Sequence, residues 1–438
     1  TMRGFATSSA TGNDNVVIGD QAGYYWKSSF NSVAIGNNAG YQGAGSRDNT
    51  LVGNNAGYNM SGSQQYNTYI GSAAGYGKNL ASNNVAVGTS ALGGTDCKSL
   101  SSANGDWTGN VAVGSGAGQY TANSFSTFIG QSAGQRAAGS SNNFFGYYAG
   151  RGYTSSEPYD NGDNNVALGR EALRNFRSGS YNVAVGRDAM KNQQDSTNNV
   201  AMGYHALSGA SSATNNTTSH NVAIGRQAMY HHGQGNYNIA IGRAALFDDV
   251  SGSLNIAIGR EAGSNNVTGT SNVFIGYQSA YGANGNSPSY NTAVGFRSLY
   301  LVTTGTYNVA FGYDSGKNIT SGPRNTTIGS KAGDTITTGE NNVFIGYGAD
   351  STTTAGSNRI GIGHDASVNQ DNTTVITGMN LRPEQPAFLA HAASLQTNLS
   401  NGTTVAFGTE VFDINGDFNN STNTFTAPAT GKYMLGFS

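Results

Sequence analysis

Charge is scarce in this chain. Only 11% of its 438 residues are charged, and 22 basic residues against 24 acidic residues give a net charge of −2. Proteins that bind nucleic acid need a basic face, and an electrostatic membrane anchor needs a polybasic cluster. The composition therefore predicts neither nucleic-acid binding nor an anchor of this kind.

Cysteine and long apolar runs are also lacking. The single cysteine, Cys97, excludes an intramolecular disulfide and a zinc site built from cysteines. No apolar run approaches the roughly 20 residues of a transmembrane helix, so membrane insertion of this segment is not expected. No apolar signal segment follows Thr1, and we interpret the chain as a mature or trimmed segment.

Glycine, in contrast, is abundant, and it marks a repeat. A short motif, clear at residues 221–229 (NVAIGRQAM), recurs twenty times when the chain is aligned on its glycine, which we call the corner glycine. Twelve of the nineteen spacings between corner glycines are 17 residues. A fixed short period predicts an all-β protein, a parallel β-solenoid or β-roll of about 20 coils, rather than a globular enzyme.

Residues one and three before the corner glycine form two apolar rows. The first is apolar in all twenty copies and the second is Val or Ile in fourteen, as at Ile224 and Val222. Because these positions are two residues apart, they share one face of a strand. We expect them to fill the interior of each coil.

Three further positions have structural signatures. The residue four before the corner glycine, the asparagine row, is Asn in seventeen copies, including Asn221 and Asn308. Stacked coils are expected to bring these amides into a ladder in which each bonds the next. The corner glycine itself, as at Gly225 and Gly312, is expected to take a positive φ. The position three residues after the corner glycine, as at Ala228, holds only Ala or Ser. This restriction predicts that the space around the side chain is narrow.

The residue two before the corner glycine, the alanine row, is expected to point out of the coil. It is Ala in eleven copies and Phe in four. A strand that is apolar on both faces is covered on both faces, and a thin coil cannot cover itself. The row therefore predicts a homo-oligomer, which Ala223→Asp would dissociate. The predicted interface includes Ala223, Ala240, Ala257, Phe128, Phe274 and Phe344.

The repeats resemble those of known fibre proteins. They are similar to the head repeats of trimeric autotransporter adhesins, the YadA-type left-handed parallel β-roll, whose strands read SVAIGxxA. They are more similar still to the NTAVGYQAL-type repeats of phage tail fibres, as at residues 291–295 (NTAVG) and 308–312 (NVAFG). The resemblance covers residues 13–367 and implies a homotrimer around a threefold axis. The period of 17 is longer than in the shortest head repeats, which predicts a side loop on each coil.

The repeat also divides the chain. Residues 1–12 are interpreted as an N-terminal extension, 13–367 as the solenoid shaft, 368–385 as a connector and 386–438 as a further domain. In the last, residues 425–434 (FTAPATGKYM) resemble the FTAPxxGxYxF signature of the C1q/TNF-like jelly roll. The resemblance implies the N-terminal half of a C-terminal β-sandwich. We expect the natural chain to continue past Ser438, and completion of the sheet by an adjacent chain is the alternative.

Four spacings between corner glycines are stretched by insertions, and three of these insertions carry aromatic residues. Solenoid insertions lie in loops on one face, often the binding face. Their aromatic side chains could stack on a sugar ring, although folding back over their own coil is the more common role. The possible receptor-binding residues are Trp107, Tyr153, Tyr159, Tyr281 and Tyr290.

Groups that could support catalysis or bind a metal are few. Asp248 and Asp249 have no histidine nearby in sequence, so solvation of their loop is favoured over acid–base chemistry. His231 and His232 would be repeated around the axis of a trimer, but a surface pair is favoured over a metal site because no third ligand has suitable spacing. We therefore expect no catalytic residues, no metal and no cofactor.

Together these features predict a homotrimeric fibre with a structural and adhesive function. A phage tail fibre that attaches to the host surface is the first interpretation, and a bacterial surface adhesin or self-assembling extracellular filament subunit is the alternative. A fibre-borne glycan depolymerase is less favoured. The expected partners are further copies of the chain, a cell-surface glycan or protein receptor, and other fibre or tail proteins. The expected location is extracellular, on a virion or a cell surface.

Overall fold

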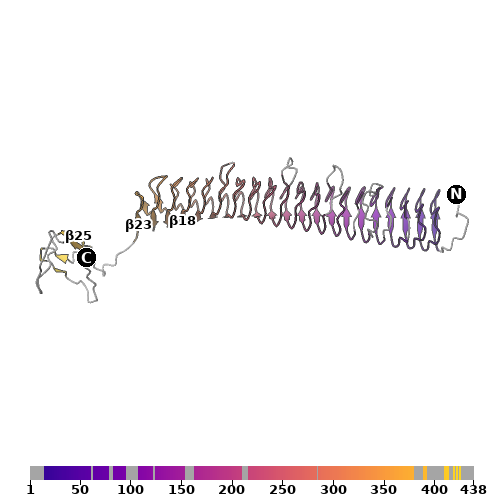
Figure 1. Ribbon diagram of the computed structural model, residues 1–438, viewed down its shortest axis with the longest axis horizontal. Helices are drawn as coiled ribbons and strands as arrows, with labels where there is room; N and C mark the ends of the chain where they lie inside the picture. Colours follow the sequence, from indigo (N-terminus) through magenta and orange to yellow (C-terminus); the bar gives the residue numbers. More distant parts are fainter. Residues whose placement is uncertain are drawn as a thin grey trace. The chain divides into compact units, whose positions relative to one another are not determined.

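The computed structural model describes residues 14–60, 63–77, 82–94, 107–121, 124–152, 162–209, 216–283 and 285–378, and short strands between 388 and 425. Throughout these ranges the chain is all-β, without a helix, and its coils follow one another as a parallel β-solenoid (Figure 1). The predicted solenoid is thus confirmed. By its contacts the chain divides into two units, Thr1–Val375 and Ile376–Ser438.

Twenty-one short strands form one parallel sheet along the solenoid. Its strands are β1 (Val16–Ile18), β2 (Val33–Ile35), β3 (Thr50–Val52), β4 (Thr68–Ile70), β5 (Val85–Val87), β6 (Val111–Val113), β7 (Thr127–Ile129), β8 (Asn143–Phe145), β9 (Val166–Leu168), β10 (Val183–Val185), β11 (Val200–Met202), β12 (Val222–Ile224), β13 (Ile239–Ile241), β14 (Ile256–Ile258), β15 (Val273–Ile275), β16 (Thr292–Val294), β17 (Val309–Phe311), β18 (Thr326–Ile328), β19 (Val343–Ile345), β21 (Ile360–Ile362) and β23 (Thr374–Ile376). The short strands β20 (Asp350–Ser351) and β22 (Ser367–Val368) form a separate pair.

Consecutive coils pair their strands in parallel and in register. Val222 of β12 pairs with Ile239 of β13, and Ala223 pairs with Ala240. The hydrogen bonds between coils therefore run along the axis of the solenoid. At an interstrand spacing of about 4.8 Å, twenty-one strands span about 95 Å.

The alanine row lies inside the coil and the apolar rows lie outside it, so the predicted orientation of the strands is wrong. Ala223 is fully buried within a single chain and belongs to its hydrophobic core. Its neighbours Val222 and Ile224 are only half-buried. The other residues predicted at the interface are likewise buried in the core, namely Ala240, Ala257, Phe128, Phe274 and Phe344. These side chains are therefore not available to another chain.

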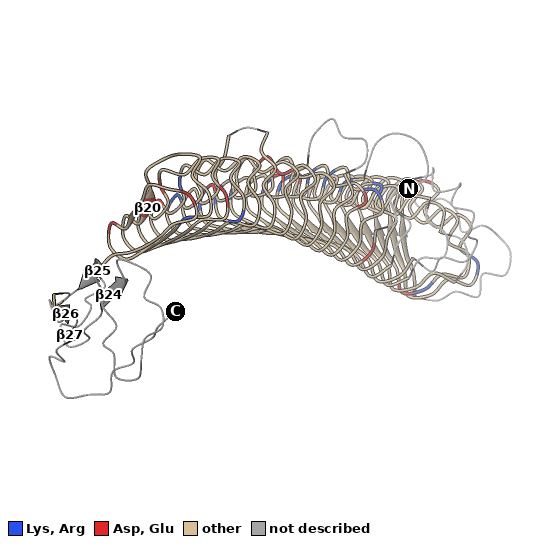
Figure 2. Cartoon of the chain, turned by 60° about the vertical axis from the view of Figure 1, so that its left-hand side comes forward, with Lys and Arg blue, Asp and Glu red and all other residues tan. Residues whose placement is uncertain are grey.

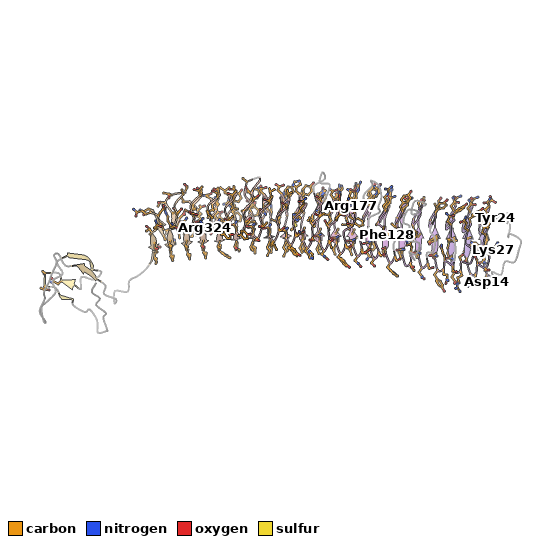
Figure 3. The ribbon with its side chains drawn as sticks, viewed as in Figure 1. Asp14, Tyr24, Lys27, Phe128, Arg177 and Arg324 are labelled. Atoms are coloured by element: carbon orange, nitrogen blue, oxygen red, sulfur yellow. The ribbon has the colours of Figure 1, made fainter. Side chains whose placement is uncertain are left out.

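The physical reason is that the interior is narrow. It is filled by the alanine row together with the position four after the corner glycine, and the two compensate in volume. Gly150 leaves room for the ring of Phe144, because a Cβ atom on Gly150 would lie 2.2 Å from that ring. Where the alanine row holds Ala, seven of the eleven coils place a buried Leu or Met at the other position, and the other four have glycine there. The seven buried residues are Leu92, Leu173, Met190, Leu207, Met229, Leu246 and Leu299. Figure 3 draws the side chains along the coils, with Phe128 labelled.

The corner glycines take the positive φ that the sequence predicts. Gly225 has a φ of 130° and Gly312 a φ of 134°. A Cβ atom on Gly225 would lie 2.5 Å from the carbonyl oxygen of Gly242, one coil away. A side chain is thus excluded both by the backbone conformation and by the close approach of the next coil. Ala228, three residues further on, is fully buried as expected.

The asparagine row forms the predicted ladder. The Nδ2 of Asn238 donates to the Oδ1 of Asn221 at 3.1 Å, and the backbone N–H of Asn238 donates to the same oxygen at 2.8 Å. Asn325 makes the same two bonds to Asn308. The Nδ2 of Asn221 also donates to the carbonyl oxygen of Gly235 at 3.0 Å. The ladder therefore satisfies buried amides and ties each coil to its neighbour.

The second unit contains two antiparallel strand pairs among its described residues. β24 (Phe388–His391) pairs with β25 (Thr409–Asp413), and β26 (Phe418–Asn419) pairs with β27 (Thr424–Phe425). Most of the run at 425–434 lies outside the described residues. The jelly roll therefore stays a prediction.

Candidate interaction surface

The two apolar rows form a hydrophobic surface on the outside of the sheet, which we call the apolar face. In-register pairing stacks its residues coil on coil, as Ile241 of β13 on Ile258 of β14. The residue directly before the corner glycine is well exposed: Ile258 is 37% exposed and Leu168 is 50% exposed. Further exposed members are Ile18, Ile70, Val113, Ile129, Met202, Phe311, Ile328 and Ile345.

Aromatic and basic residues flank the apolar face along the chain. Exposed tyrosines stand five residues before the corner glycine, as at Tyr237 and Tyr307. Exposed arginines stand directly after it, as at Arg226 and Arg243. An apolar centre with tyrosine and arginine nearby is typical of a protein–protein interface.

The residues predicted to bind a receptor do not form one site. The ring of Tyr281 stacks on Tyr300 with centroids 5.5 Å apart, and that of Tyr290 stacks on Tyr307 at 4.9 Å. Trp107 is half-buried in the coil of β6, and its carbonyl oxygen accepts a bond from the Nδ2 of Asn84 at 3.0 Å. It lies about ten coils from the two tyrosines. Tyr153 and Tyr159 lie outside the described residues, so receptor binding at these five positions stays a prediction.

A ladder of stacked tyrosines, which the sequence analysis missed, lies near the N-terminal end of the solenoid. Tyr24, Tyr41, Tyr58 and Tyr76 occupy the same position of four consecutive coils, with centroids 5.5, 4.9 and 5.3 Å apart (Figure 3 labels Tyr24). Because each ring covers the next, mainly edges and hydroxyl groups remain for a ligand. The signal in the sequence was the recurrence of Tyr at the period of the repeat.

His231 and His232 are paired with carboxylates of the next coil. The Nδ1 of His231 lies 2.7 Å from Oδ1 of Asp248. His232 and Asp249 are both fully buried, and the Nδ1 of His232 lies 3.4 Å from Oδ1 of Asp249. The interpretation of His232 as a surface residue, and of the buried Asp249 as a residue that solvates its loop, is therefore wrong. The partners are 17 residues apart, which is remote in sequence but is one coil in space.

The surroundings of the buried His232 favour its imidazolium form. Its Nε2 lies 2.8 Å from the carbonyl oxygen of Gly235, so both ring nitrogens face acceptors and both must donate. Burial alone lowers the pKa of His232, but the bonds to Asp249 and Gly235 outweigh burial and raise this pKa above its ordinary 6.5. When His232 is protonated, its charge lies beside the carboxyl group of Asp249, inside a solenoid that carries little charge elsewhere.

The stabilisation by this pair should fade as the pH rises. Because the pKa of His232 is higher in the folded chain than the ordinary 6.5, the contribution is complete below that value and is lost as the pH rises through the folded pKa. As the pH rises above about 6.5, the free energy of unfolding of the unaltered chain should fall relative to that of His232→Gln. Denaturant titrations at several pH values measure this difference. His364→Gln, which alters an exposed histidine, should follow the unaltered chain, and a difference independent of pH would contradict the assignment.

Within the described ranges, no group of three His, Cys, Asp or Glu residues could hold a metal ion. In the same ranges, no helix is both long and apolar enough to cross a membrane. No protein-family model matches the chain, and no curated protein is significantly similar to it. Its function must therefore be argued from the apolar face and the residues around it.

Proposed function

We propose that the chain is the shaft subunit of a homo-oligomeric fibre whose copies pack apolar face against apolar face. The observation that carries the proposal is the size of this face. At about 3.3 Å per residue and about 4.8 Å per strand, three residues on each of twenty-one strands cover about 950 Å², and 35 of the 42 outward residues on this face are apolar. Soluble monomers rarely expose contiguous apolar patches larger than a few hundred Å².

A further copy of the same chain is the occupant that fits the apolar face. The apolar residues of the face repeat at about 4.8 Å along its whole length. A partner with the same repeat can therefore align its own apolar residues with them on every coil. Closed symmetric assemblies are the usual form of homo-oligomers. The resemblance to adhesin and tail-fibre repeats supports three copies around a threefold axis, with the apolar faces rather than the alanine rows at the centre.

The same resemblance supports an adhesive role. We infer a phage tail fibre that attaches a virion to a cell-surface glycan or protein and joins other tail proteins. A bacterial surface adhesin or a self-assembling extracellular filament would use the same shaft and is the alternative. Either role is extracellular, and three copies would raise the avidity for a receptor. No observation on the described residues favours a glycan depolymerase.

Carboxylates on the apolar face are expected to separate the chains without unfolding them. Leu168→Asp, Ile258→Asp and Ile345→Asp together alter three exposed positions, on β9, β14 and β19. Assembly would have to bury each new charge, at a cost of about 3 kcal/mol or more. Light scattering is expected to show a trimer for the unaltered chain and a monomer for the triple variant, with the same circular dichroism spectrum.

Val250→Asp with Leu301→Asp is the matched control, because both side chains are exposed and apolar but lie outside the strands. The control should remain a trimer. A monomeric unaltered chain would refute the fibre proposal, and a trimer that survives the triple substitution would place the interface on another surface.

A further inference from the structure

Basic residues gather on one part of the solenoid. Residues 151–191 contain six of the 22 Lys and Arg residues of the chain. Figure 2, which colours basic residues blue and acidic residues red, shows how sparsely charge is placed on the coils. Four of the six pair with two carboxylates on the coils of β9 and β10, a fifth lies with one of these four over the ring of Tyr148, and we call this group the basic patch. The five are Arg151, Arg170, Arg174, Arg187 and Lys191.

The two carboxylates of the basic patch lie beneath its cations. The side chains of Glu171 and Asp188 are 9% and 5% exposed, whereas that of Arg170 is 56% exposed. Glu171 accepts bonds from Nη1 of Arg174 and Nζ of Lys191, each at 2.8 Å. Lys191 also reaches Asp188 at 3.1 Å and so bridges two coils. The carboxylates hold the cations in place, and the surface itself presents positive charge.

Positive charge remains in excess. The patch as defined contains five cations and two carboxylates, a difference of 5 − 2 = +3. Burial raises the pKa of Glu171, but Lys191 and Arg174 lower it to about 2, so Glu171 stays ionised. No acceptor among the described residues reaches the buried Nε of Arg151 or of Arg174. An anion from outside the chain would therefore be attracted to the patch.

The cations of the patch are spaced one per coil. Arg151, Arg174 and Lys191 occupy the same position of three consecutive coils, five after the corner glycine. Arg170 and Arg187 occupy the position directly after the corner glycine on two of these coils. Since coils stack at about 4.8 Å, the patch forms two lines of charge along the axis. A linear polyanion lying along the solenoid can contact a cation on every coil.

Exposed tyrosines extend one of these lines at both ends. Tyr147 stands directly after the corner glycine one coil before Arg170, and Tyr204 stands there one coil after Arg187. Each ring is 38% exposed and lies under a guanidinium group, with the Cζ of Arg170 or Arg187 5.6 Å from its centre. A tyrosine ring offers an apolar face and a polar tip, which suits a sugar ring better than a bare anion.

We propose that the basic patch binds an acidic polysaccharide that lies along the solenoid, with carboxylate groups on its cations and sugar rings against Tyr147 and Tyr204. The biological setting rests on the proposed adhesive function, because such polymers are found on cell surfaces. The patch consists of residues that follow the corner glycine, whereas the apolar face consists of residues that precede it. Because Arg170 and Arg187 occupy the position that flanks the apolar face, binding and assembly are both measured on each variant.

The test uses the full chain with polygalacturonate and neutral dextran as immobilised probes. The chain is expected to bind polygalacturonate and not dextran, and more weakly as salt rises from about 50 mM to about 500 mM. Arg151→Gln, Arg170→Gln and Arg187→Gln together leave Arg174 and Lys191 on the buried carboxylates. This triple variant should bind polygalacturonate about tenfold more weakly.

Arg47→Gln, Arg324→Gln and Lys331→Gln together are the control, because they remove the same charge from other coils. This control should change the affinity by less than about twofold. Removing residues 154–160, which carry Glu157 and Asp160 near Arg151 in the sequence, should preserve or strengthen binding. Light scattering on every variant shows whether the oligomer is intact.

Four outcomes would overturn the proposal: absence of binding to polygalacturonate, equal binding to dextran, equal losses in the two triple variants, or loss of binding when residues 154–160 are removed. Tighter binding of a poly(dT) oligonucleotide than of polygalacturonate would also overturn it, in favour of a nucleic-acid ligand. An oligomer that stays intact in these experiments would leave the proposed fibre function standing.

Discussion

Replacing Ala223 by Asp is expected to unfold part of the solenoid. Ala223 is fully buried in the core of its own chain, where a carboxylate finds no counterion and no room. The free energy of unfolding around β12 should fall by about 3 kcal/mol or more, because a charged or polar group is buried without a partner. Each coil contacts only its neighbours, so the loss should be centred on β11–β13. Hydrogen exchange followed by mass spectrometry measures it as lost protection there.

Ile224→Asp is the matched variant, one residue further along the same strand. Ile224 lies on the apolar face, so the single chain should keep its protection at β12 and only the association of chains should weaken. The two variants together report the orientation of the strand. A folded but dissociated Ala223→Asp chain, with a destabilised Ile224→Asp chain, would mean that the alanine row faces outward.

Replacing Gly225 by Ala is expected to have a similarly large effect for a different reason. At a φ of 130° an alanine is strained, and its Cβ atom would lie 2.5 Å from the carbonyl oxygen of Gly242. Strain of this kind costs about 1–3 kcal/mol, and the displaced backbone of the next coil adds to it. We expect a loss of about 3 kcal/mol in denaturant unfolding, with reduced protection of the coils of β12 and β13.

Gly45→Ala separates the two causes. Gly45 also has a positive φ, 78°, but a Cβ atom there would meet nothing within 4 Å. This variant should lose only about 1 kcal/mol, since it bears the backbone strain without the contact. Equal losses at the two glycines would show that the approach of the next coil contributes nothing.

The solenoid could be predicted from the sequence because nearly all of its contacts lie within one coil or between neighbouring coils. Once Asn221 and Asn238 are aligned on one period, the parallel pairing and the amide ladder follow from stacking alone. The corner glycines follow from the same alignment, because a turn that repeats twenty times at glycine indicates one conformation that other residues do not adopt.

The orientation of the strands could not be predicted from the hydrophobicity of the individual residues. Hydrophobicity favours Val and Ile over Ala as interior residues, and this preference misled the assignment. A better signal was the exchange of volume within a coil. Leu51, Tyr69, Phe128 and Phe144 in the alanine row are each followed by a glycine four after the corner glycine. Two positions that exchange volume in this way share one cavity, so both must face inward.

Contacts between coils could be predicted only by adding the period to a residue number. The pairing of His231 with Asp248 and the stacking of Tyr290 on Tyr307 both follow this rule of 17 residues. The bridge of Lys191 to Glu171 does not, because it joins residues twenty apart in sequence on different positions of neighbouring coils. Such a cluster depends on side-chain reach, which the repeat alone does not determine.

The hydrogen bonds between coils run along the axis, and this direction has a mechanical consequence. An axial pull on a single solenoid loads the few bonds of its terminal coil first, so the chain would open one coil after another. Each freed coil of 17 residues replaces about 4.8 Å of solenoid with up to about 58 Å of extended chain. Under tension the molecule would lengthen in steps of roughly 50 Å, and each step would dissipate part of the mechanical work done on it.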